Sequence, residues 1–285
     1  MKKFSLCLLS IFISIFLCHG QQQKENSQQV IKLLAIGNSF SEDAIEQYLF
    51  ELAGAADRKI IIGNLFIGGA PLALHVENAM ENKAAYGYRK TILDGQKISK
   101  EKVSLQEALQ DEEWDYISLQ QASTYSGQYD VVIKSLPALV EYVQAQASKN
   151  SKLVYHQTWA YHQDSKHDGF KNYQNNQQTM YESIVKVTKK LQKSDQFDMI
   201  IPSGTAIQNA RTSTMGDTFT RDGYHLELNY GRFTAACVWY EKLFGLDVRK
   251  NPYHPSTVTP AQAKISKVAA HKASKKPFKV SKVHL

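Results

Sequence analysis

Apolar runs of strand length alternate with segments of helical pattern along most of this chain, and this alternation limits the folds available to it. The first run, VIKLLAIG at residues 30–37, is almost continuously apolar and ends in glycine. Such a run is typical of a strand buried on both faces of a parallel sheet, and we expect it to be the central strand. Ser41, followed by two acidic residues, then predicts the N-cap of a helix whose apolar positions continue to Leu52.

Four further apolar runs predict four more strands. They are KIIIGNLF at residues 59–66, WDYISLQ at 114–120, KLVYHQTW at 152–159 and DMIIPSG at 198–204. Helical patterns separate them, and the last main helix is expected at residues 230–244. Residues 86–103 interrupt the alternation and predict a hairpin insertion. The pattern therefore predicts an α/β fold, a three-layer α/β/α sandwich around a mainly parallel, five-stranded sheet.

The two ends of the chain depart from this pattern. Residues 1–20 carry two lysines and an apolar stretch too short to span a bilayer comfortably, which predicts a signal peptide, with a retained membrane anchor as the alternative. Residues 21–29 are interpreted as a linker, 30–250 as the domain and 251–285 as a basic extension with a solvated, partly disordered end. We expect a secreted or periplasmic protein with no stable membrane anchor after cleavage.

The net charge of +7 does not by itself indicate a partner. Nine basic residues and no acidic ones follow Asp247, and two more bases lie in the leader, so residues 21–247 are mildly acidic. We therefore expect no nucleic-acid partner. Cys237 is the one cysteine outside the leader, which excludes an internal disulfide or a cysteine metal site in the mature chain. The sequence does not indicate an oligomeric state.

Three residues supply the parts of a nucleophilic hydrolase. Ser39 follows the expected central strand, and the carboxyl ends of parallel strands form the reactive surface of such sheets. Serine needs a base to take its proton, and His225 is the candidate. Asp222 can accept the imidazole N–H from the same side of a helical turn. A helix cap and a solvated loop are the ordinary alternatives, but Ser41 is the better cap, which leaves Ser39 free.

Acyl transfer also needs N–H donors aimed at the oxyanion that forms on the substrate. The candidates are the backbone N–H groups of Ser39 and of Gly69 in IGG, and the carboxamide of Gln120 in LQQAS. Glycine pairs also form ordinary turns, and a glutamine that ends a strand is often simple polar surface. These candidates therefore gain weight only if the fold brings them to one place.

Together these motifs resemble the SGNH, or GDSL-like, hydrolase superfamily over roughly residues 31–245. GNSFS resembles the block with the nucleophile, IGG the glycine block, and RDGYHL the D-x-x-H block. The resemblance implies a flavodoxin-like fold without a cofactor or metal. It also implies catalytic roles for Ser39, Asp222 and His225, and an oxyanion hole that includes Ser39 and Gly69.

The third block of that superfamily normally contains GxND, whereas this chain has LQQAS. Gln120 is our candidate for its oxyanion donor and Gln121 the second choice. Asn38 also stands where many members have aspartate. The strings HQTWAY, GTAIQNAR and TRDGYHL resemble a secreted bacterial branch whose members are mostly described as a domain of unknown function.

The implied function is ester hydrolysis through an acyl-enzyme. Aromatic residues near the strand ends, including Tyr125 and Tyr161, can stack on a sugar or simply fill the core. We take Trp159, Tyr224 and Gln121 as candidate substrate-binding residues. A sugar-binding aromatic surface on a secreted protein favours a carbohydrate O-acetylesterase, whose partner is a small-molecule or glycan ester. The alternative is a secreted glycan-binding protein on an inactive SGNH scaffold.

Two other enzyme classes fit the sequence less well. An α/β-hydrolase shares the Ser, Asp, His order, but its nucleophile lies in GxSxG, and GNSFS has Ser41 in place of the final glycine. A metal enzyme would have to use a set of residues that lacks the helical HExxH spacing and is better explained as a wet loop beside the pocket. That set is His156, His162, Asp164, His167 and Asp168.

Overall fold

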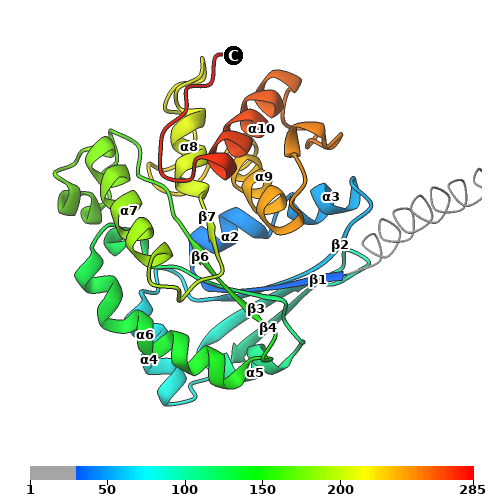
Figure 1. Ribbon diagram of the computed structural model, residues 1–285, viewed down its shortest axis with the longest axis vertical. Helices are drawn as coiled ribbons and strands as arrows, with labels where there is room; N and C mark the ends of the chain where they lie inside the picture. Colours follow the sequence, from blue (N-terminus) through cyan, green and yellow to red (C-terminus); the bar gives the residue numbers. More distant parts are fainter. Residues whose placement is uncertain (1–29) are drawn as a thin grey trace, which may run out of the picture.

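The computed structural model describes residues 30–285, which form an α/β fold around one sheet (Figure 1). The seven strands lie in the order β4-β3-β2-β1-β5-β6-β7, which confirms the expected central strand. Five strands run parallel: β1 (Val30–Gly37), β2 (Lys59–Phe66), β5 (Tyr116–Leu119), β6 (Lys152–His156) and β7 (Met199–Ile201). The predicted signal peptide and linker lie outside the described residues.

The prediction of five strands is wrong because the hairpin of residues 86–103 joins the sheet. Its strands are β3 (Tyr86–Thr91) and β4 (Lys97–Val103), and β3 pairs antiparallel with the outer edge of β2. Without β3, that edge of β2 would present unpaired N–H and C=O groups. Strand β4, with the sequence KISKEKV, then forms an exposed edge whose lysines discourage pairing with another chain.

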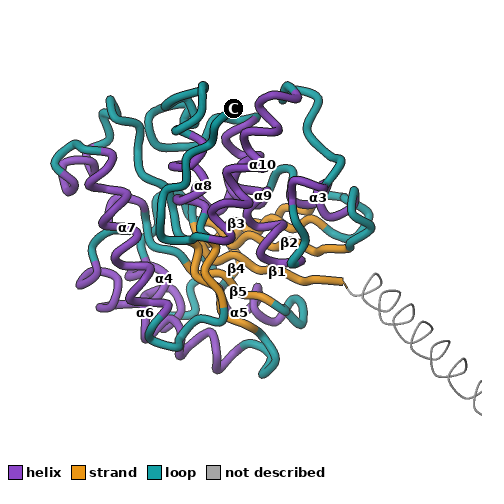
Figure 2. Tube along the Cα trace, turned by 45° about the horizontal axis from the view of Figure 1, so that its top comes forward, coloured by secondary structure: helices purple, strands orange, loops and turns teal. Residues whose placement is uncertain are grey.

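Helices cover both faces of the sheet (Figures 1 and 2). One face carries α2 (Ser39–Ile45), α3 (Leu49–Gly54), α8 (Ser203–Ala210), α9 (Tyr230–Phe244) and α10 (Pro260–Lys275). The other carries α4 (Leu72–Met80), α5 (Leu105–Gln110) and α6 (Tyr129–Gln146). Helix α7 (Gln177–Gln192) contributes to both cores. Short 3₁₀ helices are η1 (Ser123–Tyr125), η2 (Asp168–Tyr173) and η3 (Val248–Lys250).

The central strand shows why a continuous apolar run was needed. Leu33 and Ala35 of β1 enter the core beneath α2 and α9, whereas Leu34 and Ile36 enter the core beneath α4 and α6. Side chains alternate across a strand, so both sets must be apolar when both faces are covered. Within residues 30–285, no helix combines the length and the apolar character needed to cross a membrane.

The start of α2 corrects the predicted cap. The helix begins at Ser39, and the Asn38 side chain caps it by accepting a hydrogen bond from Phe40 N at 3.0 Å. Ser41 is instead buried within the first turn, with its Oγ 2.7 Å from Asn38 O and 2.8 Å from Asn64 Oδ1. Asparagine is as good an N-cap as serine, and here it stands at the last position before the helix.

The basic C-terminal segment is also different from our expectation. Residues 260–275 form α10, which packs against α8 and α9, and Ala269, Ala270 and Ala273 are fully buried. The prediction of a solvated, partly disordered end is therefore wrong for this segment. Small alanines at helical spacing allow close helix packing, while lysines such as Lys264 and Lys275 stay exposed.

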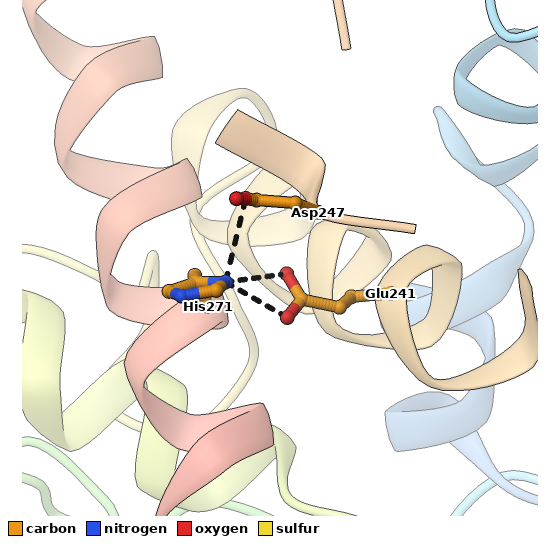
Figure 3. A group of neighbouring side chains, drawn as sticks. All are labelled: Glu241, Asp247 and His271. Carbon is orange, nitrogen blue, oxygen red and sulfur yellow. Dashed lines mark hydrogen bonds and ion pairs between the residues drawn. The ribbon is translucent and has the colours of Figure 1, made fainter. Parts of the chain in front are cut away.

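Charged groups fasten α10 to the rest of the domain (Figure 3). His271 Nδ1 lies 2.9 Å from Glu241 of α9 and 3.3 Å from Asp247, which follows that helix. Arg249 forms a forked ion pair with Asp247, with distances from 2.6 to 3.2 Å. Glu241, Asp247 and His271 bring their ligand atoms within 4.8 Å of one another, as a cation would require. The imidazole and the guanidinium already offer both carboxylates a partner, so an ion-pair cluster accounts for this arrangement.

These contacts predict that loss of the Asp247 carboxylate lowers the stability of the protein more at neutral pH than at acidic pH. Hydrogen bonds from the Arg249 side chain are the main reason that the pKa of Asp247 falls from 3.8 to about 2. Partial burial opposes this fall, while the Arg249 N–H and His271 add to it. Its stabilising contribution is therefore complete above pH 3.8 and is lost as the pH falls toward about 2. Asp247→Asn should lower the urea midpoint at pH 7, and the difference from wild type should narrow at pH 3. An unchanged difference at pH 3 would contradict this assignment.

Candidate active site

The carboxyl ends of the parallel strands bring the predicted site residues to one edge of the sheet. Ser39 follows β1, Gly69 follows β2, Gln120 follows β5, and Trp159 comes shortly after β6. His225 reaches this edge from the loop between α8 and α9. Residues that are far apart in the sequence therefore meet where an open α/β sheet usually binds its ligand.

Ser39, His225 and Asp222 form a continuous hydrogen-bonded chain. His225 Nε2 lies 2.8 Å from Ser39 Oγ, and His225 Nδ1 lies 2.6 Å from Asp222 Oδ2. A carboxylate only accepts hydrogen bonds, so Nδ1 carries the proton and Nε2 presents its lone pair to the serine hydroxyl. Ser39 and His225 are half-buried, and Asp222 is more open to solvent. The geometry is that of a nucleophile, a base and an orienting acid.

The acid and the base lie on a tight turn rather than on the helical turn that we expected. Asp222 Oδ1 accepts hydrogen bonds from Tyr224 N at 3.1 Å and His225 N at 2.8 Å, while Gly223 has φ 93°. Burial opposes ionisation of Asp222, but hydrogen bonds from the His225 ring and from these two N–H groups lower its pKa below the ordinary value. The turn thus shapes the backbone and keeps the acid ionised.

A buried aspartate, Asp43, joins this turn to the helix that carries Ser39. Asp43 stands one turn after Ser39 in α2 and is fully buried. It accepts hydrogen bonds from Leu226 N at 2.8 Å, from Arg221 at 2.9 and 3.0 Å, and from Arg232 Nε at 2.8 Å. Sequence reasoning missed this role because, with Ser41 taken as the cap, Asp43 falls in the first turn of the helix, where an acid is expected for the helix dipole alone.

The contacts of Asp43 predict that its replacement lowers the stability of the protein strongly. Asp43→Asn keeps the size of the side chain but removes the buried charge that Arg221 and Arg232 both contact, which should lower the free energy of unfolding by about 3–5 kcal/mol. Glu42→Gln is the matched control: Glu42 is more exposed, its charge pairs with Arg89 and Arg232 are 3.5 and 4.0 Å long, and a change below about 1 kcal/mol is expected. Urea unfolding of both variants tests this, and equal effects would refute the role of Asp43.

Gly69 lies beside the nucleophile in an open loop. Asn38, which precedes Ser39, donates from Nδ2 to Ala70 O at 3.0 Å and so ties this loop to the start of α2. Gly69 has φ 68°, and a Cβ atom added there would meet nothing within 4 Å. The need for glycine is therefore conformational rather than steric, and the space next to its backbone is free for a ligand.

Gln120 is buried and acts on the nucleophile through Asn38. Its Nε2 donates to Asn38 Oδ1 at 2.8 Å, and its Oε1 accepts from His156 Nδ1 at 2.8 Å. Burial lowers the pKa of His156 to about 3, so this imidazole is neutral. The chain from His156 through Gln120 to Asn38 holds the loop before Ser39 in place.

Two of the predicted substrate-binding residues have structural positions instead. Gln121 is buried, and its Oε1 accepts hydrogen bonds from Leu72 N at 3.0 Å and Ala122 N at 2.8 Å. Trp159 is fully buried, stacks on Phe40 at 4.3 Å and donates to Tyr224 O at 2.7 Å. A fully buried ring cannot stack on a substrate, so the expectation for Trp159 is corrected. Its indole supports the turn that carries His225.

Tyr224 is half-buried, and its ring lies 4.1 Å from the His225 ring between centroids. This position remains suited to a substrate contact.

The histidines considered for a metal do not converge: His156 is buried against Gln120, His162 Nε2 lies 3.6 Å from Asp217, and the His167 ring packs on Tyr224. Tyr161, also named as a possible platform, is buried as well.

Comparison with known proteins supports this fold over nearly the whole described chain. A family model described as a domain of unknown function, DUF4886, matches residues 32–273. The crystal structure of a DUF4886 protein from Bacteroides uniformis ATCC 8492 is 52% identical, with TM-score 0.88, over 90% of this chain and 98% of that chain. An acetyl-xylooligosaccharide esterase from Geobacillus Stearmophilus has 12% identity and TM-score 0.50, over 76% and 95% of the two chains, which is a likeness of fold alone. No curated protein matches the sequence.

Proposed function

The chain belongs to the DUF4886 family, a domain of unknown function, and from this premise we propose that it is a serine-dependent ester hydrolase of the SGNH type. The observation that carries the proposal is the hydrogen-bonded chain from Ser39 through His225 to Asp222, with distances of 2.8 and 2.6 Å. A binding protein has no use for a base aimed at a serine hydroxyl. A structural neighbour of similar fold is described as an esterase, which supports this proposal.

The proposed reaction has two steps. In the first, Ser39 Oγ attacks the ester carbonyl carbon while His225 Nε2 takes the hydroxyl proton, and that proton is then given to the departing alcohol. In the second, His225 takes a proton from the water that attacks the acyl-serine carbonyl, and it then gives this proton to Ser39 Oγ as the bond to the acyl group breaks and the carboxylic acid leaves. Throughout, Asp222 holds the imidazole in the required tautomer and stabilises its protonated form.

The proposed oxyanion donors are the backbone N–H groups of Ser39 and Gly69. Ser39 is the first residue of α2, so its N–H has no partner within the helix. Gln120 is the third candidate; its oxygen and one N–H are engaged, and the second N–H of its amide would be the one to contribute. That contribution stays a prediction.

We further propose that the ester is an O-acetyl group on a carbohydrate. The half-buried Tyr224 beside His225 offers an aromatic ring suited to contact with a sugar, and the neighbour of similar fold is described as an acetyl-xylooligosaccharide esterase. Secretion or periplasmic location, as expected from the leader, would bring the protein to such glycans. The second reading, a glycan-binding protein without turnover, lacks a reason for the three aligned side chains.

An ester panel tests the proposal. Purified protein would be assayed for release of acetate from 4-nitrophenyl acetate and from partially acetylated xylo- and cello-oligosaccharides, and for labelling by a fluorophosphonate. Hydrolysis and labelling, both dependent on Ser39, are expected. Glycan binding without labelling or acetate release would support the binding protein instead.

A further inference from the structure

A long loop, residues 161–176, is packed against the turn that carries the proposed acid and base. His162 N donates to Gly223 O at 2.8 Å, and a Cβ atom on Gly223 would lie 3.0 Å from Ser165 Oγ. The His167 ring packs edge-on against Tyr224, with 4.6 Å between centroids, and Tyr224 in turn contacts His225. One aromatic ring therefore separates this loop from the proposed catalytic base.

Residues of the loop line an open, polar hollow of about 370 Å³ at the surface, which we call the cavity. Its lining consists of residues 163–168, Lys171 and Asn175. Four lining residues are charged, two acidic (Asp164 and Asp168) and two basic (Lys166 and Lys171), so their charges balance. Among residues 30–285, none of these four side chains takes part in an ion pair or a side-chain hydrogen bond. Their charged groups are therefore available to a ligand.

Hydrogen bonds of Gln163, which lines the cavity, connect the two ends of the loop and join it to Gln177 and Asp217. Gln163 donates from Nε2 to Asn175 O at 2.9 Å, its backbone N–H donates to Asp217 at 3.0 Å, and its Oε1 accepts from Gln177 N at 3.0 Å. Gln177 also donates to Asp217 at 2.7 Å. The backbone of the loop is therefore ordered before a ligand binds, and binding has to order only the side chains.

We propose that this cavity is a subsite for a neutral sugar unit on the alcohol side of the ester, an inference that rests on the proposed function. Carboxylates, ammonium groups and amides together can accept from and donate to the many hydroxyls of a sugar, and the balanced charge favours a neutral ring over an ionic one. Two residues of its lining contact the turn of Asp222 and His225: Ser165 lies against Gly223, and the His167 ring packs on Tyr224. A second cavity, lined by residues that include Ile31, Asp115 and Lys152, lies at the amino ends of the strands and cannot serve this reaction.

The test compares a large and a small substrate. Asp168→Ala and Lys171→Ala should each lower kcat/KM for partially acetylated xylo-oligosaccharides by about tenfold, mainly through KM, because each removes a charged hydrogen-bonding partner of the sugar. The same variants should change kcat/KM for 4-nitrophenyl acetate by less than about twofold, because that ester has no sugar to lose. Lys193→Ala, at the far end of α7, is the matched surface control and should behave as wild type on both.

The outcomes separate the subsite from the function on which it rests. Variants that match wild type on the oligosaccharide, or that lose activity equally on both substrates, overturn the subsite and leave the esterase standing. A wild-type protein that hydrolyses neither substrate overturns both. Calorimetry with the Ser39→Ala protein and deacetylated xylo-oligosaccharide adds a measurement without turnover: binding that Lys171→Ala weakens about tenfold supports the subsite, and binding that it leaves unchanged contradicts it.

Discussion

Ser39→Ala is expected to lower the rate of ester hydrolysis by at least about 10⁴-fold and to abolish fluorophosphonate labelling. The change removes only the hydroxyl oxygen that lies 2.8 Å from His225 Nε2. Binding and the oxyanion donors remain, so a small residual activity above the uncatalysed rate should survive. The helix should be unaffected because Asn38, not Ser39, provides its cap.

Ser41→Ala is the control for this experiment. Ser41 stands two residues further along the same helix, but it is buried and turned toward Asn38 O and Asn64 rather than toward His225. The variant should keep fluorophosphonate labelling even if it is somewhat less stable. Labelling that persists in Ser39→Ala would show that the nucleophile lies elsewhere and would overturn the proposed mechanism.

Asp222→Asn should lower kcat by about 10³–10⁴-fold. The carboxylate fixes the imidazole proton on Nδ1, whereas an asparagine can present its NH₂ group and so move the proton to Nε2, where it blocks the serine. The amide oxygen can still accept from Tyr224 N and His225 N, as Asp222 Oδ1 does, so the turn should keep its shape. The measurement is kcat on 4-nitrophenyl acetate at several pH values.

Asp222→Ala separates the two roles of this side chain. It removes both the orienting oxygen and the acceptor for the two backbone N–H groups, so it should be at least as inactive as Asp222→Asn and less stable to urea. Retention of kcat within about tenfold of wild type by the asparagine variant would argue that Asp222 is only a turn former. Between pH 5 and 8 the acid should stay ionised, because its pKa lies below the ordinary value.

The parallel strands and the central place of β1 could be predicted because a strand buried on both faces has a distinctive pattern. All five parallel strands were identified from such apolar runs, and VIKLLAIG is the central one. The hairpin was recognised, but whether it joins the sheet depends on the unpaired edge of β2, which no local pattern reveals. The packing of α10 could not be predicted from charge, because the many lysines of this segment indicate a solvated end and the alanines that the fold buries carry no charge.

The site was only partly predictable for a similar reason. Residue types and chain position pointed to Ser39, Asp222 and His225, and the structure brings these three together. Asp43 joins the turn to α2 through contacts that span more than 170 positions in the sequence, and no residue adjacent to Asp43 predicts them. Trp159 was misjudged because an aromatic residue after a strand can face either the ligand or the core, and only tertiary packing decides.

The contact between Ser39 and His225 spans 186 positions of the chain. Ser39 emerges from the ribosome early, with β1 and α2, whereas Asp222 and His225 follow more than 180 positions later. Helix α10, which packs on α9, the helix that follows His225 in the sequence, comes later still. The serine is thus made long before the base that would activate it. The proposed chemistry therefore requires the folded domain, and a chain interrupted before Asp222 would carry a serine without its base.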